Sequence, residues 1–159
     1  MTKRILLLPT LLFLAAPAAL MAQEGEAAGM AMEEDVDMTI VDADGIEYAP
    51  MEVPGFDSGM EIAVLNGDPS AEGPYVLRLT FPDGYRFPPH WHPKTENLTV
   101  IQGTLLLAMG ETVDDTALQQ YSPGDYIHIP AGNRHYGGAT GWTEIQLHGI
   151  GPFEINLVE

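Results

Sequence analysis

Four side chains in the second half of this sequence have the types and spacing of ligands for a divalent metal ion. His90 and His92 are two residues apart, and in an extended strand this spacing puts both imidazoles on one face. Glu96 follows a Pro-Lys-Thr turn, and His135 comes after a later turn-bounded strand. Three imidazoles and a carboxylate suit iron, manganese, nickel, copper or zinc, and the ligand types alone do not choose among these metals.

Two interpretations of this group follow from the residues alone. In the first, four protein ligands hold one six-coordinate ion and leave two positions for water, dioxygen or a substrate. In the second, the histidines are structural or face the solvent, which is the usual explanation of a single isolated histidine.

A strand later in the chain carries further polar side chains. In TEIQLHG, Gln146 and His148 alternate with Ile145 and Leu147, so the two polar residues share the face opposite the apolar pair. This face is either solvated or forms a pocket wall, where His148 and Gln146 would be the catalytic candidates for proton transfer near the metal. We expect His128 to point outward, because the core should take the isoleucines on either side of it.

From about residue 39 to residue 159 the sequence consists of short apolar strands and turn signals. The expected strands are IEYAPMEVPG, EIAVLNGDP, YVLRLTFPDG, NLTVIQG, TLLLAMG, DYIHIP, TEIQLHGI and FEINLV. We expect a tight hairpin at Gly103, a glycine-rich link at Gly137 and Gly138, and one short helical turn within ETVDDTALQQY. Short strands at this spacing predict an all-β antiparallel sandwich or barrel. The expected core includes Phe81, Phe87, Leu98, Val100, Leu105 and Leu107.

Residues 1–22 have the pattern of a secretory signal peptide. Lys3 and Arg4 precede an apolar run over residues 5–20, and Ala22 offers a cleavage site before Gln23. The alternative is a membrane anchor, but the run contains two prolines and is shorter than the roughly 20 residues that a span requires. We therefore predict a secreted or periplasmic protein. Residues 23–38 are acidic, contain no aromatic side chain and are predicted to form a flexible leader.

The charge of the chain excludes several classes of partner. Removal of the signal would leave four fixed cations against 23 acidic residues, a net charge of −19. Such a protein repels phosphate backbones and anionic headgroups, so we predict neither nucleic-acid binding nor membrane binding after cleavage. The absence of cysteine excludes disulfides, thiolate metal sites and a cysteine nucleophile.

Two stretches around the proposed ligands resemble the paired sequence motifs of the cupin family. The fixed positions of the first motif match Gly84, His90, His92, Glu96 and Gly103, and those of the second match Gly124, Pro130, Gly132 and His135. Ala139 stands where many cupins have asparagine, a residue that is not a metal ligand in the family. The chain also resembles small exported single-domain cupins in its GDP, GPY and GIGPF segments, at residues 67–69, 73–75 and 149–153.

The resemblance implies a cupin-type antiparallel β-jelly-roll barrel over residues 39–159. It also implies one divalent metal bound by His90, His92, Glu96 and His135, and it favours the metal-centre interpretation. Cupins include many activities, so the resemblance does not fix the reaction. We expect a small metalloenzyme of oxygenase or isomerase type acting on a small organic molecule, or alternatively a non-catalytic metal-binding or ligand-sensing module. A homodimer is expected from the exposed sheet edges of a small jelly roll.

Overall fold

The alternation of apolar and polar residues after residue 38 produces strands joined by short turns. A computed structural model of the protein describes residues 38–159, so the predicted signal peptide and all but the last residue of the predicted leader lie outside the described residues. The strands are β1 (Ala49–Pro50), β2 (Glu61–Asn66), β3 (Gly73–Phe81), β4 (Arg86–Trp91), β5 (Glu96–Met109), β6 (Gln119–Tyr121), β7 (Tyr126–Ile129), β8 (His135–Gly151) and β9 (Asn156–Leu157). Two 3-10 turns, η1 (Ala43–Gly45) and η2 (Asp115–Ala117), are the helical elements of this region. No helix within residues 38–159 is long and apolar enough to cross a membrane.

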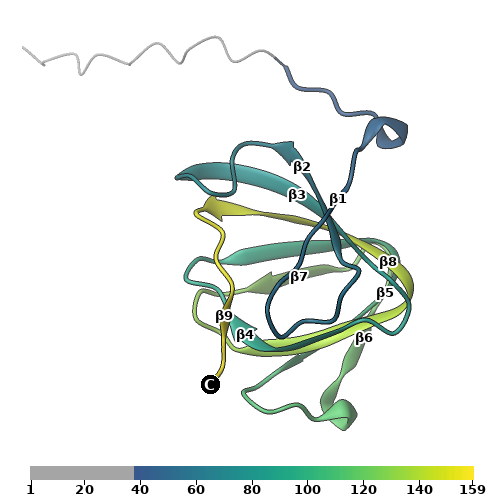
Figure 1. Ribbon diagram of the computed structural model, residues 1–159, viewed down its shortest axis with the longest axis vertical. Helices are drawn as coiled ribbons and strands as arrows, with labels where there is room; N and C mark the ends of the chain where they lie inside the picture. The colour runs from purple at the N-terminus through teal and green to yellow at the C-terminus, as the bar shows by residue number, and fades with distance from the viewer. Residues whose placement is uncertain (1–37) are drawn as a thin grey trace, which may run out of the picture. The chain divides into compact units, whose positions relative to one another are not determined.

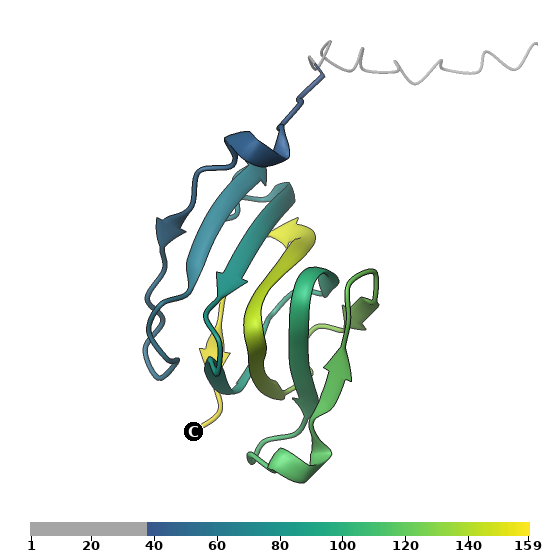
Figure 2. The same cartoon turned by 90° about the vertical axis from the view of Figure 1, so that its right-hand side faces the viewer.

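Two long strands, β5 and β8, belong to both layers of the fold. In one layer the second half of β8 pairs with β3 on one side and with the first half of β5 on the other. This half of β5 also pairs with β7. In the other layer the first half of β8 pairs with β4 on one side and with the second half of β5 on the other. This half of β5 also pairs with β6. All strand pairs are antiparallel, and the strands form one sheet that curves so that its two layers face each other across the interior (Figures 1 and 2). This arrangement confirms the predicted all-β antiparallel jelly roll.

The predicted hairpin at Gly103 is wrong. β5 is one continuous strand of 14 residues, and it pairs with β8 on both sides of Gly103. The register shifts twice around this glycine, between Val100 and Gln102 and between Gln102 and Thr104. Gly103 has a φ of 78°, and a Cβ atom there would overlap the carbonyl oxygen of Trp142. The glycine therefore serves a bulge in which the strand bends from one layer into the other.

The predicted link at Gly137 and Gly138 is also wrong, because both residues lie inside β8, a strand of 17 residues. A Cβ atom at Gly137 would overlap the carbonyl oxygen of Leu106, and one at Gly138 would overlap that of Tyr85. These glycines permit close approach of neighbouring backbone, a use of glycine that the sequence does not distinguish from a flexible connection.

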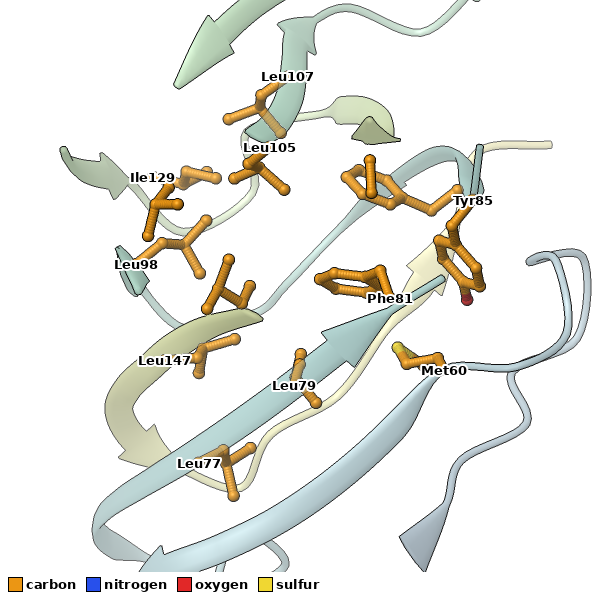
Figure 3. Close-up of a cluster of buried hydrophobic side chains, with 14 of the residues drawn as sticks. Met60, Leu77, Leu79, Phe81, Tyr85, Leu98, Leu105, Leu107, Ile129 and Leu147 are labelled. Carbon is orange, nitrogen blue, oxygen red and sulfur yellow. The ribbon is translucent and has the colours of Figure 1, made fainter. Parts of the chain in front are cut away.

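The interior is filled by side chains from the facing strands. In β3, Tyr75, Leu77 and Leu79 are buried while the residues between them are not, as a half-buried strand requires. Figure 3 shows Leu79 and Phe81 of β3 directed into the same interior as side chains of β5 and β8. All six residues that the sequence assigned to the core are buried, namely Phe81, Phe87, Leu98, Val100, Leu105 and Leu107.

Candidate metal centre

The three histidines of the predicted ligand set meet in the interior. β4 carries His90, and His92 follows immediately after its last residue. His135 is the first residue of β8 and is the direct cross-strand partner of His90. One ligand nitrogen from each of these buried imidazoles lies within 4.8 Å of the others. The cluster therefore forms only when β4 and β8, which are far apart in the sequence, pair.

Backbone carbonyls fix which nitrogen of each imidazole faces inward. The Nδ1 atom of His90 lies 2.8 Å from the carbonyl oxygen of Pro88, and that of His135 lies 3.1 Å from the carbonyl oxygen of Asn133. His92 Nδ1 lies 2.7 Å from the carbonyl oxygen of Glu154. Because a carbonyl can only accept a hydrogen bond, each Nδ1 carries the proton and each Nε2 keeps a free lone pair. This is the tautomer that a metal-binding imidazole needs.

Glu96, the first residue of β5, brings a carboxylate close to two of the three histidines. Its Oε2 atom lies 3.4 Å from Nε2 of His92 and 3.6 Å from Nε2 of His135. Oε2 of Glu96 and Nε2 of His92 are buried and have no hydrogen-bond partner. Buried polar atoms are normally paired, so two unpartnered atoms of this kind 3.4 Å apart fit a bound cation.

Burial sets the charge state of the four groups. It lowers the pKa of His90 to about 3 and that of His135 to about 4, and it also lowers the pKa of His92. Desolvation raises the pKa of Glu96 to about 8. The imidazoles are therefore neutral in neutral solution, which is the form that binds metals. The raised pKa keeps Glu96 largely protonated there without a metal, and a bound divalent cation would favour its carboxylate form.

The four residues line a pocket whose other walls are apolar. Its empty volume is about 490 Å³, part of which opens to solvent. Apart from the four proposed ligands, all its lining residues are apolar: Phe56, Phe81, Phe87, Phe153, Met51, Met60, Leu79, Leu98, Leu105, Leu107, Ile145 and Ile155. In Figure 1 the segment between β1 and β2, which supplies Met51, Phe56 and Met60, crosses one side of the barrel.

Comparison with known families agrees with the motifs and the fold. The family model described as the cupin domain matches residues 77–149, a range that contains all four proposed ligands. Residues 77–149 therefore contain a cupin domain. No curated protein sequence matches it.

Several solved structures share the fold of this cupin. A polyketide cyclase from Streptomyces resistomycificus has a TM-score of 0.64 at 19% identity, with 77% of this chain and 87% of that chain covered. A protein from Methylibium petroleiphilum, described as a proposed acetylacetone dioxygenase, has a TM-score of 0.62 at 16% identity, with coverages of 80% and 85%. A cupin 2 conserved barrel domain protein from Rhodopseudomonas palustris has a TM-score of 0.57 at 16% identity, with coverages of 71% and 77%. At these identities the likeness shows the cupin fold alone.

The two catalytic candidates of the sequence lie away from the pocket of this cupin. Gln146 accepts a hydrogen bond from Nε of Arg78 at 3.1 Å, and neither it nor His148 lines the pocket. Both alternate with the buried residues Ile145 and Leu147, so their side chains occupy the outer face of β8. Their role in proton transfer stays a prediction. His128 is exposed, as expected, with its Nδ1 atom 3.0 Å from Oδ1 of Asn97.

Sequence reasoning missed the parts of the site that come from outside the regular strands. The ring of Phe153 stacks on His92 with centroids 5.1 Å apart, and the ring of Phe56 lies 5.0 Å from that of His90. The carbonyl of Glu154, which orients His92, belongs to the same C-terminal segment as Phe153. The GIGPF segment was the available signal for that contact. Phe56 lies in a turn-rich segment whose position no periodic pattern indicates.

Proposed function

We propose that this cupin is a metal-dependent enzyme of the oxygenase type that acts on a small organic molecule in its barrel. The observation that carries the proposal is the convergence of three inward-facing Nε2 atoms and the unpartnered Glu96 Oε2 atom in an otherwise apolar pocket. His90, His92, Glu96 and His135 would hold one divalent transition metal. A bound metal of this kind would supply Lewis-acid or redox chemistry at the positions that the protein leaves free.

The remaining residues of the site would orient the ligands and exclude water. The three carbonyl contacts fix the imidazole tautomers, and partners of this type strengthen metal binding. Phenylalanine rings pack against His90 and His92 and limit access of water to them. A dry pocket strengthens the electrostatic interactions at the metal and protects reactive species from water.

The pocket lining favours an oxygenase over an isomerase. Isomerisation by proton transfer needs a positioned acid or base that is free of the metal. Apart from the four proposed ligands, no described residue that lines the pocket carries such a group. Oxidation at a metal does not require one. The description of one fold neighbour as a proposed dioxygenase is consistent with this class of reaction.

The same apolar lining supports a second candidate function, a metal-containing binding or sensing module without turnover. The two candidates are separated by oxygen-electrode assays and product analysis on protein loaded in turn with iron, manganese, nickel, copper or zinc. An oxygenase should consume dioxygen with at least one small apolar substrate, and His90→Ala should abolish this consumption. Saturable ligand binding without consumption or product, with every metal, would favour the binding module.

Export and self-association are further proposals of ours. The signal-like residues 1–22 support export, and protein recovered from the secreted or periplasmic fraction should begin near Gln23. An intact Met1 in the membrane fraction would contradict this proposal. The edge strands of the jelly roll support a homodimer. Sedimentation at moderate ionic strength that shows only the monomer would contradict it.

A further inference from the structure

The polar side chains that line the metal pocket are neighbours of one another. They belong to His90, His92, Glu96 and His135, and every other described lining residue has an apolar side chain. A ligand in this pocket can therefore satisfy a polar group only near the proposed metal. A hydroxyl or charged group elsewhere on the ligand would be buried without a partner, which is unfavourable.

The fixed cations of the described region do not reach the pocket. Arg78 pairs with Glu144 at 2.5 Å on the outer face, and Arg134 pairs with Glu111 at 3.2 Å. Arg86 and Lys94 are exposed and absent from the lining. Recognition of a carboxylate or a phosphate normally uses a cation of this type, often in a bidentate pair. The pocket walls therefore offer nothing to an anionic group.

Aromatic rings form the walls next to the proposed ligands. Phe56 and Phe87 both pack against His90, with ring centroids at 5.0 Å and 5.5 Å, and Phe153 stacks on His92. Phe56 is half-buried and comes from the segment between β1 and β2, outside the barrel strands. Its position lets it contact a ligand beside His90 without contributing to the central strand pairing.

We propose that the pocket takes a small, uncharged, predominantly hydrocarbon molecule, with an aromatic ring or alkyl group against the phenylalanine walls. The single polar end of this molecule faces the four proposed ligands, and Phe56 determines the specificity for the apolar end. The placement of the polar end rests on the metal-dependent function proposed above. The prediction that charged groups on the ligand are excluded follows from the apolar walls and does not depend on the metal-dependent function.

A matched pair of phenols tests the substrate class. Para-cresol and para-hydroxybenzenesulfonate share a phenolic end. At the opposite end, para-cresol carries a methyl group and para-hydroxybenzenesulfonate carries an anionic sulfonate. Isothermal titration calorimetry should show that the metal-loaded protein binds para-cresol at least ~100-fold more tightly, because the sulfonate would be buried without a partner. Equal affinity, tighter binding of the sulfonate, or no binding of either phenol would overturn the proposal.

Variants at Phe56 test the specificity residue. Phe56→Lys places an ammonium at the wall. It should lower the ratio of the affinity for para-cresol to that for the sulfonate by at least ~10-fold. Phe56→Leu keeps the wall apolar, should preserve the preference and should weaken para-cresol binding by roughly 2- to 10-fold. Trp142→Lys is the control, because Trp142 is 47% exposed and lies outside the lining. An unchanged preference in folded Phe56→Lys together with unchanged affinity in Phe56→Leu would overturn the role of Phe56.

The design separates this inference from the proposed enzyme. The same titrations on chelator-treated protein should give the same order of affinities, because the apolar walls remain. If the protein binds no metal yet prefers para-cresol, the metalloenzyme proposal fails and the ligand class stands. If the protein binds metal and does not prefer para-cresol, the ligand class fails and the metal centre stands.

Discussion

Nδ1 of His92 donates a hydrogen bond to the carbonyl oxygen of Glu154, 62 residues later in the chain and 2.7 Å away. The C-terminal segment thus orients a proposed metal ligand that belongs to a different part of the barrel. The neighbouring Phe153 stacks on the same imidazole. Contacts of this kind behind a metal ligand usually strengthen metal binding, because they hold the ring and its tautomer in place.

Removal of residues 154–159 should therefore weaken metal binding by roughly 10- to 100-fold, which competition with a chromogenic chelator would measure. The matched control removes residues 156–159 only, so that β9 is lost while the carbonyl of Glu154 stays in the chain. If both truncations lower the affinity equally, strand β9 and not the Glu154 carbonyl supports the site.

Metal removal should destabilise the barrel, because the proposed ligands come from separate strands that an ion would hold together. An ion that binds only the folded state raises the free energy of unfolding by about 2.7 kcal/mol when its free concentration is ~100 times its dissociation constant. Chelator should therefore lower the melting temperature of the metal-loaded protein measured by calorimetry. His135→Ala should melt lower and respond little to chelator, whereas His128→Ala should keep the wild-type response because His128 is exposed and outside the cluster. Identical melting curves with and without chelator would contradict the prediction.

Gly103→Ala should lower the free energy of unfolding by at least ~2 kcal/mol in chemical denaturation, because a Cβ atom there meets the backbone of Trp142 and Thr143. Gly84→Ala separates the steric clash from backbone strain. Gly84 has nearly the same φ, 77° against 78°, but a Cβ atom there meets nothing within 4 Å. This control should cost only about 1 kcal/mol. Equal losses in the two variants would mean that the close approach at Gly103 is not what requires glycine.

The sequence predicted those parts of the protein that depend on spacing within a strand. The two-residue spacing of His90 and His92, and the alternation of Ile145 with Gln146, correctly indicated which side chains share a face. Gly103 shows the limit of this reasoning, because a glycine with positive φ serves a turn and a bulge equally well. Phe56 shows another limit, since its contact with His90 is made between segments that no periodic pattern connects.

His148→Ala tests the catalytic role that the sequence suggested for His148 and Gln146. Their place on the outer face of β8, away from the pocket lining, leads us to expect a turnover rate within about twofold of wild type. Metal content and melting temperature should also be unchanged. Loss of a true general acid or base typically costs ~10²–10⁴-fold in rate. A fall of that size with intact metal content would restore the proton-transfer assignment.

The most direct test of the metal centre is the metal stoichiometry of the purified protein. Chelator-treated protein would be titrated with each candidate divalent metal and analysed for bound metal after desalting, beside the His90→Ala and His128→Ala variants. The wild type and His128→Ala should each retain one ion per chain, and His90→Ala should retain much less. Absence of bound metal in the wild type, or full retention in folded His90→Ala, would contradict a metal centre built from His90, His92, Glu96 and His135.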